Sequence, residues 1–150
     1  PEPLAHETGK TVVGLDGRKM SKSYGNIIPI FAPEKQLRKL VMKIVTNSQS
    51  IEEPKDPDSC SVFSLYKCFA DDQQIAALRE RYLQGGMGWG HAKQELFDIM
   101  NAQLSPYREK FNLLMADPGY INETLKQGSD KARELAAKKI QDLRTLLGID

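Results

Sequence analysis

Near the front of the chain stands the segment Gly17-Arg18-Lys19-Met20-Ser21-Lys22-Ser23-Tyr24-Gly25-Asn26. It holds two lysine ammonium groups and two serine hydroxyls between glycines, which permit tight turns and close approach of the backbone to a ligand. Lysines are mobile point charges that suit a polyphosphate, and hydroxyls and loop N–H groups donate to phosphate oxygens. Because a departing pyrophosphate accumulates negative charge, positioned cations stabilise its release. These residue types therefore predict a loop that binds a nucleoside triphosphate.

The bulk composition sets limits on partners and compartment. The chain has 150 residues, enough for one domain with a core, and its 21 Lys and Arg against 20 Asp and Glu leave a net charge of +1. A nucleic-acid partner therefore requires a local basic patch. No apolar run approaches the roughly 20 residues that span a bilayer, and the first residues lack the features of a signal peptide. We expect a cytoplasmic protein that has no membrane partner and, with two isolated histidines and two distant cysteines, no protein-bound metal.

Residues 1–32 are expected to be loop and short extended pieces. Two of these pieces, residues 11–13 and 27–31, are β-branched or apolar and are bounded by Gly or Pro. They have the composition of edge strands, but they are too few to form a sheet by themselves.

From Pro33 onward the pattern is helical. Apolar residues from Leu37 to Val45 recur at the spacing of one helix face, and the segment Thr46-Asn47-Ser48 is expected to end that helix. A short helix is predicted over residues 61–69, and a further helix should begin at a cap formed by Asp71 or Asp72. The next break is the glycine-rich stretch at residues 85–90.

The last third of the chain predicts three helical pieces. A long helix follows Trp89, and Pro106 should kink or divide it. Asp117-Pro118 opens another helix that is expected to close at Gly128, and Ser129 then caps the last. In that last helix the residues expected to face inward are Ala132, Leu135, Ala136, Ile140, Leu143 and Leu147. The fold class is therefore mainly α, with a helical bundle over residues 33–150 behind a loop region at 1–32.

The string Lys19-Met20-Ser21-Lys22-Ser23 resembles the KMSKS signature of class I aminoacyl-tRNA synthetases. In that family the loop closes over ATP during amino-acid adenylation. The resemblance implies that Lys22 carries most of the charge developing on pyrophosphate and that Lys19 assists. It also makes Met20, Ser21 and Ser23 part of the ATP site, and it makes Gly17, Gly25 and Asn26 organisers of a mobile loop.

Four later segments resemble those of tryptophanyl-tRNA synthetases and occur in the same order. They are Thr46-Asn47-Ser48, Gly88-Trp89-Gly90-His91-Ala92-Lys93, Leu104-Ser105-Pro106-Tyr107-Arg108-Glu109-Lys110-Phe111 and Gly128-Ser129-Asp130-Lys131-Ala132-Arg133. Together they imply the carboxy-terminal part of a bacterial-type tryptophan–tRNA ligase, with residues 1–32 at the edge of the catalytic domain and 33–150 as the anticodon-binding domain.

This resemblance carries further expectations. The full enzyme would bind ATP with Mg²⁺, L-tryptophan and tRNA(Trp), and it would act as a homodimer. No HIGH signature and no Rossmann α/β pattern occur in the chain, so we expect both upstream of Pro1 and expect the fragment alone to be inactive and monomeric. Lys131 and Arg133 are candidate tRNA contacts.

Three alternatives remain open at this point. The chain is also compatible with a stand-alone helical RNA-binding module that grips backbone phosphate, with a tyrosyl-tRNA synthetase fragment, and with a purely structural helical domain. Binding of RNA with a salt dependence set by Lys19 and Lys22 would favour the first.

Overall fold

The computed structural model describes residues 11–149 of the chain. Within that range every regular element is helical: the 3₁₀ turn η2 (Lys22–Tyr24) and the α-helices α1 (Glu34–Met42), α2 (Ser61–Tyr66), α3 (Asp72–Gln84), α4 (Trp89–Ala116) and α5 (Pro118–Leu147). The helices form two compact units, of which the first ends at Arg108 and the second begins at Glu109. The prediction of a mainly α chain is thus confirmed.

The two expected edge strands do not form in the described part of the chain. Val13 makes one isolated antiparallel bridge with Lys19, and residues 27–31 have no bridge partner. Ile28 is buried in the helical core, whereas Ile30 remains 58% exposed. The β-branched composition is thus used for packing and for a tight loop, because no neighbouring strand is present to complete a ladder.

Helix α1 begins at Glu34, and Pro33, with φ = −53° and ψ = 147°, is its N-cap. Leu37 and Val41 are fully buried on one face, as the apolar spacing predicts. The helix ends at Met42, four residues before the expected end at Thr46-Asn47-Ser48. The last turn tightens there, where the Lys43 N–H donates to Leu40 O and the Ile44 N–H to Val41 O.

Helix α3 begins as the sequence predicts. Asp71 accepts a hydrogen bond from the Gln74 N–H at 2.8 Å, and the Gln74 side chain accepts one from the Asp71 N–H at 3.0 Å. This is a complete capping box. The preceding helix α2 is shorter than expected and ends at Tyr66.

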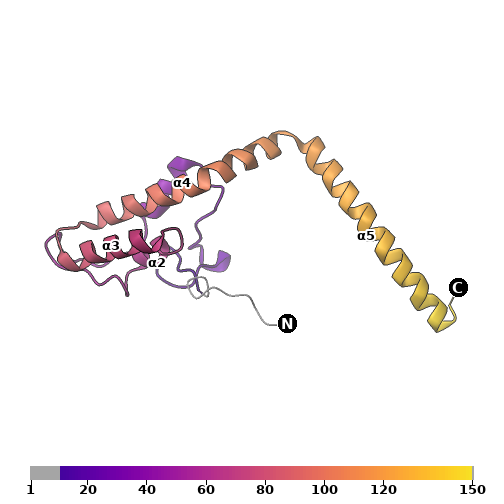
Figure 1. Ribbon diagram of the computed structural model, residues 1–150, viewed down its shortest axis with the longest axis horizontal. Helices are drawn as coiled ribbons and strands as arrows, with labels where there is room; N and C mark the ends of the chain where they lie inside the picture. The colour runs from indigo at the N-terminus through magenta and orange to yellow at the C-terminus, as the bar shows by residue number, and fades with distance from the viewer. Residues whose placement is uncertain (1–10, 150) are drawn as a thin grey trace. The chain divides into compact units, whose positions relative to one another are not determined.

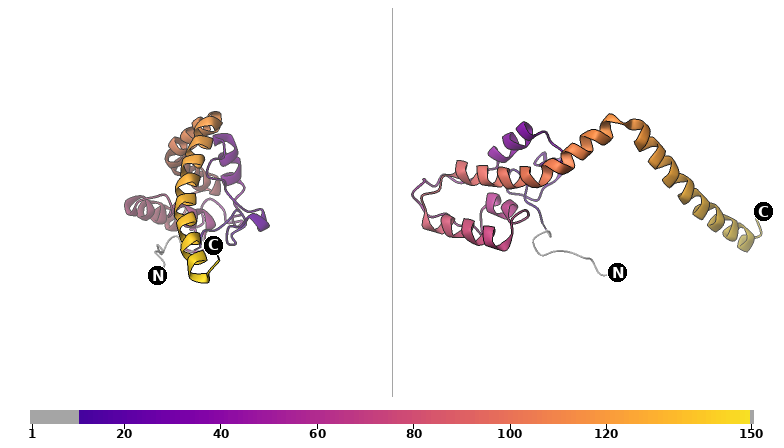
Figure 2. Two further views of the ribbon diagram at one scale, coloured as in Figure 1. Left: turned by 90° about the vertical axis from the view of Figure 1, so that its right-hand side faces the viewer. Right: turned by 45° about the horizontal axis from the view of Figure 1, so that its top comes forward.

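Helix α4 lies between α1 on one side and the pair α2 and α3 on the other (Figures 1 and 2). Arg81 of α3 binds Glu95 of α4 through two hydrogen bonds of 2.9 and 2.6 Å, and Arg38 of α1 donates to Gln94 at 3.0 Å. The core between these helices is apolar and includes Leu37, Val41, Val62, Phe63, Leu78, Tyr82, Ala92 and Leu96.

Pro106 does not divide α4, which runs without interruption from Trp89 to Ala116. The loss of one backbone donor at a proline is tolerated where the helix is held by packing on its earlier turns. Ala92, Leu96 and Met100 are buried along that stretch, whereas Tyr107 is 64% exposed.

The second unit corrects two expectations. Helix α5 continues through Gly128 and Ser129, where the sequence predicts a stop and a new start. A single glycine costs a helix about 1 kcal/mol without breaking it, and an exposed serine need not cap. Within the described residues of this unit no side chain is buried, so the expected inward stripe is exposed: Leu135 is 75%, Ile140 50%, Leu143 42% and Leu147 70% exposed, and Ala132 and Ala136 are exposed as well.

Candidate functional site

Residues 12–26 form a tight, hydrogen-bonded loop that carries the KMSKS string. The Gly14 N–H donates to Arg18 O at 2.7 Å, and the Met20 N–H donates to Val12 O at 2.8 Å. Gly17 sits at the turn with φ = +81°, a conformation that L side chains rarely adopt. The loop is therefore a short hairpin-like turn followed by the η2 turn, which ends at Gly25 with φ = +65°.

Asn26 lies at the centre of this loop and is 3% exposed. Its Nδ2 donates to Asp16 Oδ1 at 2.7 Å and to Lys19 O at 3.2 Å, while its Oδ1 accepts from the Ser21 N–H at 2.8 Å. A Cβ built on Gly14 would come within 2.4 Å of the Asn26 side chain. The loop thus needs glycine at position 14 to admit the amide that joins its two halves.

Asp16 is the acidic partner in this arrangement. The hydrogen bond from Asn26, and after it the bonds from Arg18, lower the pKa of the Asp16 carboxyl to about 2. Arg18 Nε donates to Asp16 Oδ2 at 2.7 Å, and its guanidinium lies over the Tyr24 ring at 4.6 Å from the centroid. Arg18 is thus engaged inside the loop, which leaves the two signature lysines as its uncommitted cations.

Lys19 and Lys22 are both exposed, and neither forms an ion pair with any residue in the range 11–149. Beside them the hydroxyls of Ser21 and Ser23 lie 2.8 Å apart in a mutual hydrogen bond. Two free ammonium groups next to two exchangeable hydroxyl donors form a surface suited to a multiply charged anion. The other residues singled out from the sequence, Met20, Gly17, Gly25 and Asn26, belong to the same loop.

The loop is attached to the helical unit on one side. The Val45 N–H donates to Leu15 O at 2.9 Å, and Met20 and Leu15 pack against the core. A Cβ on Gly17 would lie 3.2 Å from Ser61 Oγ at the start of α2. One side of the loop is therefore fixed to the helices, whereas Lys22, Ser23 and Tyr24 project into solvent.

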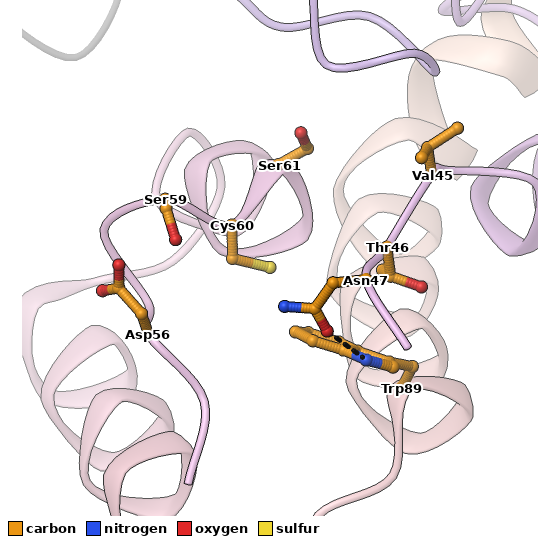
Figure 3. Close-up of a pocket in the computed structure, with 8 residues that line it drawn as sticks. All are labelled: Val45, Thr46, Asn47, Asp56, Ser59, Cys60, Ser61 and Trp89. Atoms are coloured by element: carbon orange, nitrogen blue, oxygen red, sulfur yellow. Dashed lines mark hydrogen bonds between the residues drawn. The ribbon is translucent and has the colours of Figure 1, made fainter. Parts of the chain in front are cut away.

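A pocket of about 300 Å³ opens beside this attachment point (Figure 3). Asn47 and Trp89 lie on one side of it, and Asp56, Ser59 and Cys60 lie on the other. Asn47 Oδ1 accepts a hydrogen bond from Trp89 Nε1 at 3.2 Å. The pocket therefore offers an indole, hydroxyl groups and a carboxylate around one space.

Trp89 is held firmly at the edge of that pocket. Its ring meets Tyr82 edge to face at a centroid distance of 5.9 Å, and the Lys55 ammonium lies 5.3 Å from its centroid. Lys55 is only 1% exposed, and it donates to Ser50 O at 2.8 Å and Glu53 O at 3.1 Å. Tyr82 is fully buried, and burial raises the pKa of its hydroxyl strongly, so it stays protonated. These contacts fix the position of the indole ring at the pocket.

The remaining candidates lie elsewhere or do not converge. Lys131 and Arg133 are on α5 in the second unit, where Arg133 pairs with Asp130 at 3.0 Å. Across the described residues no three His, Cys, Asp or Glu side chains approach closely enough to hold a metal ion, and no helix is long and apolar enough to cross a membrane.

Comparison with known proteins decides the family. The model of the class I tRNA synthetases for tryptophan and tyrosine matches residues 1–105. The chain belongs to this family of class I tRNA synthetases. It is 46% identical over 99% of its length to the tryptophan–tRNA ligase of Pseudomonas aeruginosa and 42% identical over 99% to that of Campylobacter jejuni strain RM1221.

Solved structures agree with this class I synthetase assignment. The crystal structure of tryptophanyl-tRNA synthetase from Campylobacter jejuni complexed with ADP and tryptophan matches 95% of the chain at a TM-score of 0.89 and 43% identity. A second crystal structure of the same synthetase matches 92% of the chain at a TM-score of 0.84. The chain spans 33% and 47% of the two curated ligases and 45% of the first solved chain, so it matches a third to a half of such enzymes. The resemblance to tryptophanyl-tRNA synthetases is thereby confirmed.

Sequence reasoning found the loop of this synthetase and missed its surroundings. Asp16 and Gly14 carried no signal of their own, because their roles depend on where Asn26 is placed ten or more residues later. The pocket residues come from four separate segments, and only Thr46, Asn47 and Trp89 belong to segments in which the sequence resembles tryptophanyl-tRNA synthetases.

Proposed function

We propose that this chain is the carboxy-terminal part of a tryptophan–tRNA ligase, which activates tryptophan with ATP and transfers it to tRNA(Trp). The observation that carries the proposal is the KMSKS loop, whose two lysines form no ion pair with the described residues, in a chain that is 42–46% identical to tryptophan–tRNA ligases over 99% of its length. The alternative of a tyrosine enzyme is less favoured, because the similar full-length proteins named above are tryptophan enzymes.

In this proposal the loop acts on the departing pyrophosphate. The tryptophan carboxylate attacks the α-phosphorus of ATP, and the bond to the bridging oxygen breaks, so that negative charge builds up on the leaving group. Lys22 neutralises most of that charge and Lys19 assists. Ser21 and Ser23 exchange their mutual hydrogen bond for phosphate oxygens, while Asn26 and the flanking glycines keep the loop in shape as it closes.

The loop does not fit direct coordination of Mg²⁺. Its exposed donors are ammonium and hydroxyl groups, and its one carboxylate, Asp16, is already engaged by Asn26 and Arg18. A hard cation prefers carboxylate, carbonyl and water oxygens. We therefore expect magnesium to arrive with the nucleotide, and no step of the proposal depends on its contacts with this chain.

The helical part is proposed to contact tRNA. Unpaired RNA bases are recognised by stacking on aromatic rings and by hydrogen bonds to their edges. The pocket beside Trp89 has one fixed indole together with the hydroxyls of Thr46 and Ser61 and the Asp56 carboxylate. This chemistry suits one unstacked base. We further propose that residues 1–32 form the edge of the catalytic domain and that residues 33–150 form the anticodon-binding domain. The complete enzyme is proposed to be a homodimer.

The test is amino-acid-dependent pyrophosphate exchange by the full-length enzyme that contains this chain. The proposal expects exchange that requires tryptophan, with tyrosine at least about 10²-fold less effective, because a pocket built around one side chain discriminates strongly where polar groups differ. The chain alone should show no exchange. Exchange driven by tyrosine, or RNA binding by the full-length enzyme without exchange, would favour the alternatives instead.

A further inference from the structure

Helix α1 carries a row of lysines that no described residue neutralises. Lys35, Lys39 and Lys43 are spaced four residues apart, with Lys43 at the C-cap, so they lie along one face of the helix. All three are exposed, and within residues 11–149 none of their ammonium groups takes part in an ion pair or a hydrogen bond.

The arginines of helix α3 show the opposite arrangement. Arg79 binds both carboxylate oxygens of Asp58, and Arg81 binds both of Glu95. The chain is nearly neutral overall, with 21 basic and 20 acidic residues, so the excess of positive charge on α1 is a local feature. On α1 only Glu34, at the very first turn, carries a negative charge.

The same lysines line a groove. A shallow depression of about 450 Å³ runs along α1, and it is bordered by Lys35, Gln36, Lys39, Leu40 and Lys43. Its walls therefore contain three ammonium groups and one amide, and no carboxylate. Such a surface attracts an elongated anion more than an apolar or cationic partner.

The row is also held in place from behind. Leu37 and Val41 are fully buried on the opposite face of α1, and Lys93 of α4 donates to Met42 O at 3.3 Å. Successive lysines rise about 6 Å along the helix axis, so the row spans about 12 Å. Cations repeated over that length on one fixed helix match a partner whose negative charges also repeat, which a single small anion does not provide.

We propose that the lysine row of α1 (Lys35, Lys39 and Lys43) binds the sugar–phosphate backbone of tRNA. This inference rests on the proposed function, which supplies the RNA. Lysines make contacts to phosphate that position a nucleic acid and carry no base preference. The row would therefore hold the RNA in register for the other contacts, and it would contribute to affinity for tRNA in a salt-dependent way.

The experiment compares three variants of the full-length enzyme. In the first, Lys35→Gln, Lys39→Gln and Lys43→Gln are combined. We expect its KM for tRNA to rise about tenfold or more, and the slope of log affinity against log salt to fall by roughly 2 to 3, since each lost phosphate contact removes a little less than one unit. Tryptophan-dependent pyrophosphate exchange without tRNA should stay within about twofold of the wild type, because that reaction needs no RNA.

The second variant carries Lys→Arg at the same three positions and should retain tRNA binding, since it keeps the charges. The third carries Lys110→Gln, Lys126→Gln and Lys139→Gln, which removes the same charge from exposed sites elsewhere. It should raise the KM for tRNA and lower the salt slope clearly less than the first variant does.

Several results would overturn the inference. One such result is an unchanged KM for tRNA and an unchanged salt slope in the first variant. Another is a rise in the KM for tRNA in the third variant equal to that in the first. A third is a first variant that loses tryptophan-dependent pyrophosphate exchange together with tRNA charging. Absence of tryptophan-dependent exchange in the wild-type enzyme would instead overturn the proposed function, so the two failures are distinguishable.

Discussion

The helical unit up to Arg108 and helix α5 carry similar apolar periodicity but use it differently. In the first unit the spacing places Leu37, Val41 and Leu96 in a closed core with no exposure. In α5 an equally regular stripe leaves Leu135 75% exposed. The difference shows that a helical pattern predicts a face, while burial of that face depends on a partner elsewhere in the fold.

The largest expected effect on stability comes from creating a cavity in the core of the first unit. Phe63→Ala should lower the free energy of unfolding by about 3–5 kcal/mol, because the ring is fully buried and packs against Tyr82 at a centroid distance of 5.4 Å. Urea unfolding followed by the fluorescence of Trp89, the single tryptophan, reports on this unit.

The matched change on the other region is Leu135→Ala, which should shift the same transition by less than about 0.5 kcal/mol. A large loss from Leu135→Ala in this chain would mean that the stripe of α5 is buried, and the contrast between the two regions would then be wrong.

Alanine substitutions at two glycines, one in each region, should change stability in opposite directions. Gly14→Ala should destabilise the loop by about 1–3 kcal/mol, because its new methyl group would meet Asn26 at 2.4 Å. Gly128→Ala should stabilise α5 by about 1 kcal/mol, since it lies inside the helix with open space around it.

Amide hydrogen exchange measures both changes locally. Faster exchange at the Ser21 N–H in the first variant and slower exchange around residue 128 in the second are expected. Faster exchange around residue 128 in Gly128→Ala would contradict a continuous α5. It would support the helix end at Gly128 and the new helix start at Ser129 that the sequence predicted.

The smallest effect concerns acid stability. The depressed pKa of Asp16, about 2 in the folded loop, means that the folded state holds this proton less tightly than the unfolded state. Its contribution is therefore complete above the ordinary carboxyl pKa of about 4 and is lost as pH falls from there towards 2.

Asp16→Asn should flatten that part of the pH dependence, as measured by urea unfolding between pH 5 and pH 2, roughly the window set by the two pKa values. Because Asp16 is not deeply buried, the effect should be small and reduced by salt. An unchanged acid limb would show that the bonds from Asn26 and Arg18 do not persist in solution.

Much of the fold followed from local signals. The sequence predicted a cap at Asp71 or Asp72, and the spacing of Leu37 and Val41 predicted the buried face of α1, since both depend on neighbours in sequence. The sequence did not predict that α5 continues through Gly128. One glycine costs a helix only about 1 kcal/mol, so the residues on both sides of it can keep the helix intact.

The candidate site also has features that the sequence predicted and features that only the fold reveals. The contiguous string from Lys19 to Ser23 identified the loop, but its support by Asp16 and Gly14 depends on a fold that brings Asn26 back against them. The lysines of α1 are spaced four residues apart in the sequence, but their lack of anionic partners among residues 11–149 is a property of the structure and could not be predicted from that spacing.

The most direct test of the account is the rate of tryptophan-dependent pyrophosphate exchange by the full-length enzyme carrying Lys22→Ala, with Lys110→Ala as the control for loss of an exposed lysine. We expect Lys22→Ala to lower kcat by about 10²-fold or more with a smaller change in the KM for ATP, because the charge it neutralises appears only as pyrophosphate departs. Lys110→Ala should behave as wild type. A loss of only a few-fold at Lys22, equal to that at Lys110, would contradict the account.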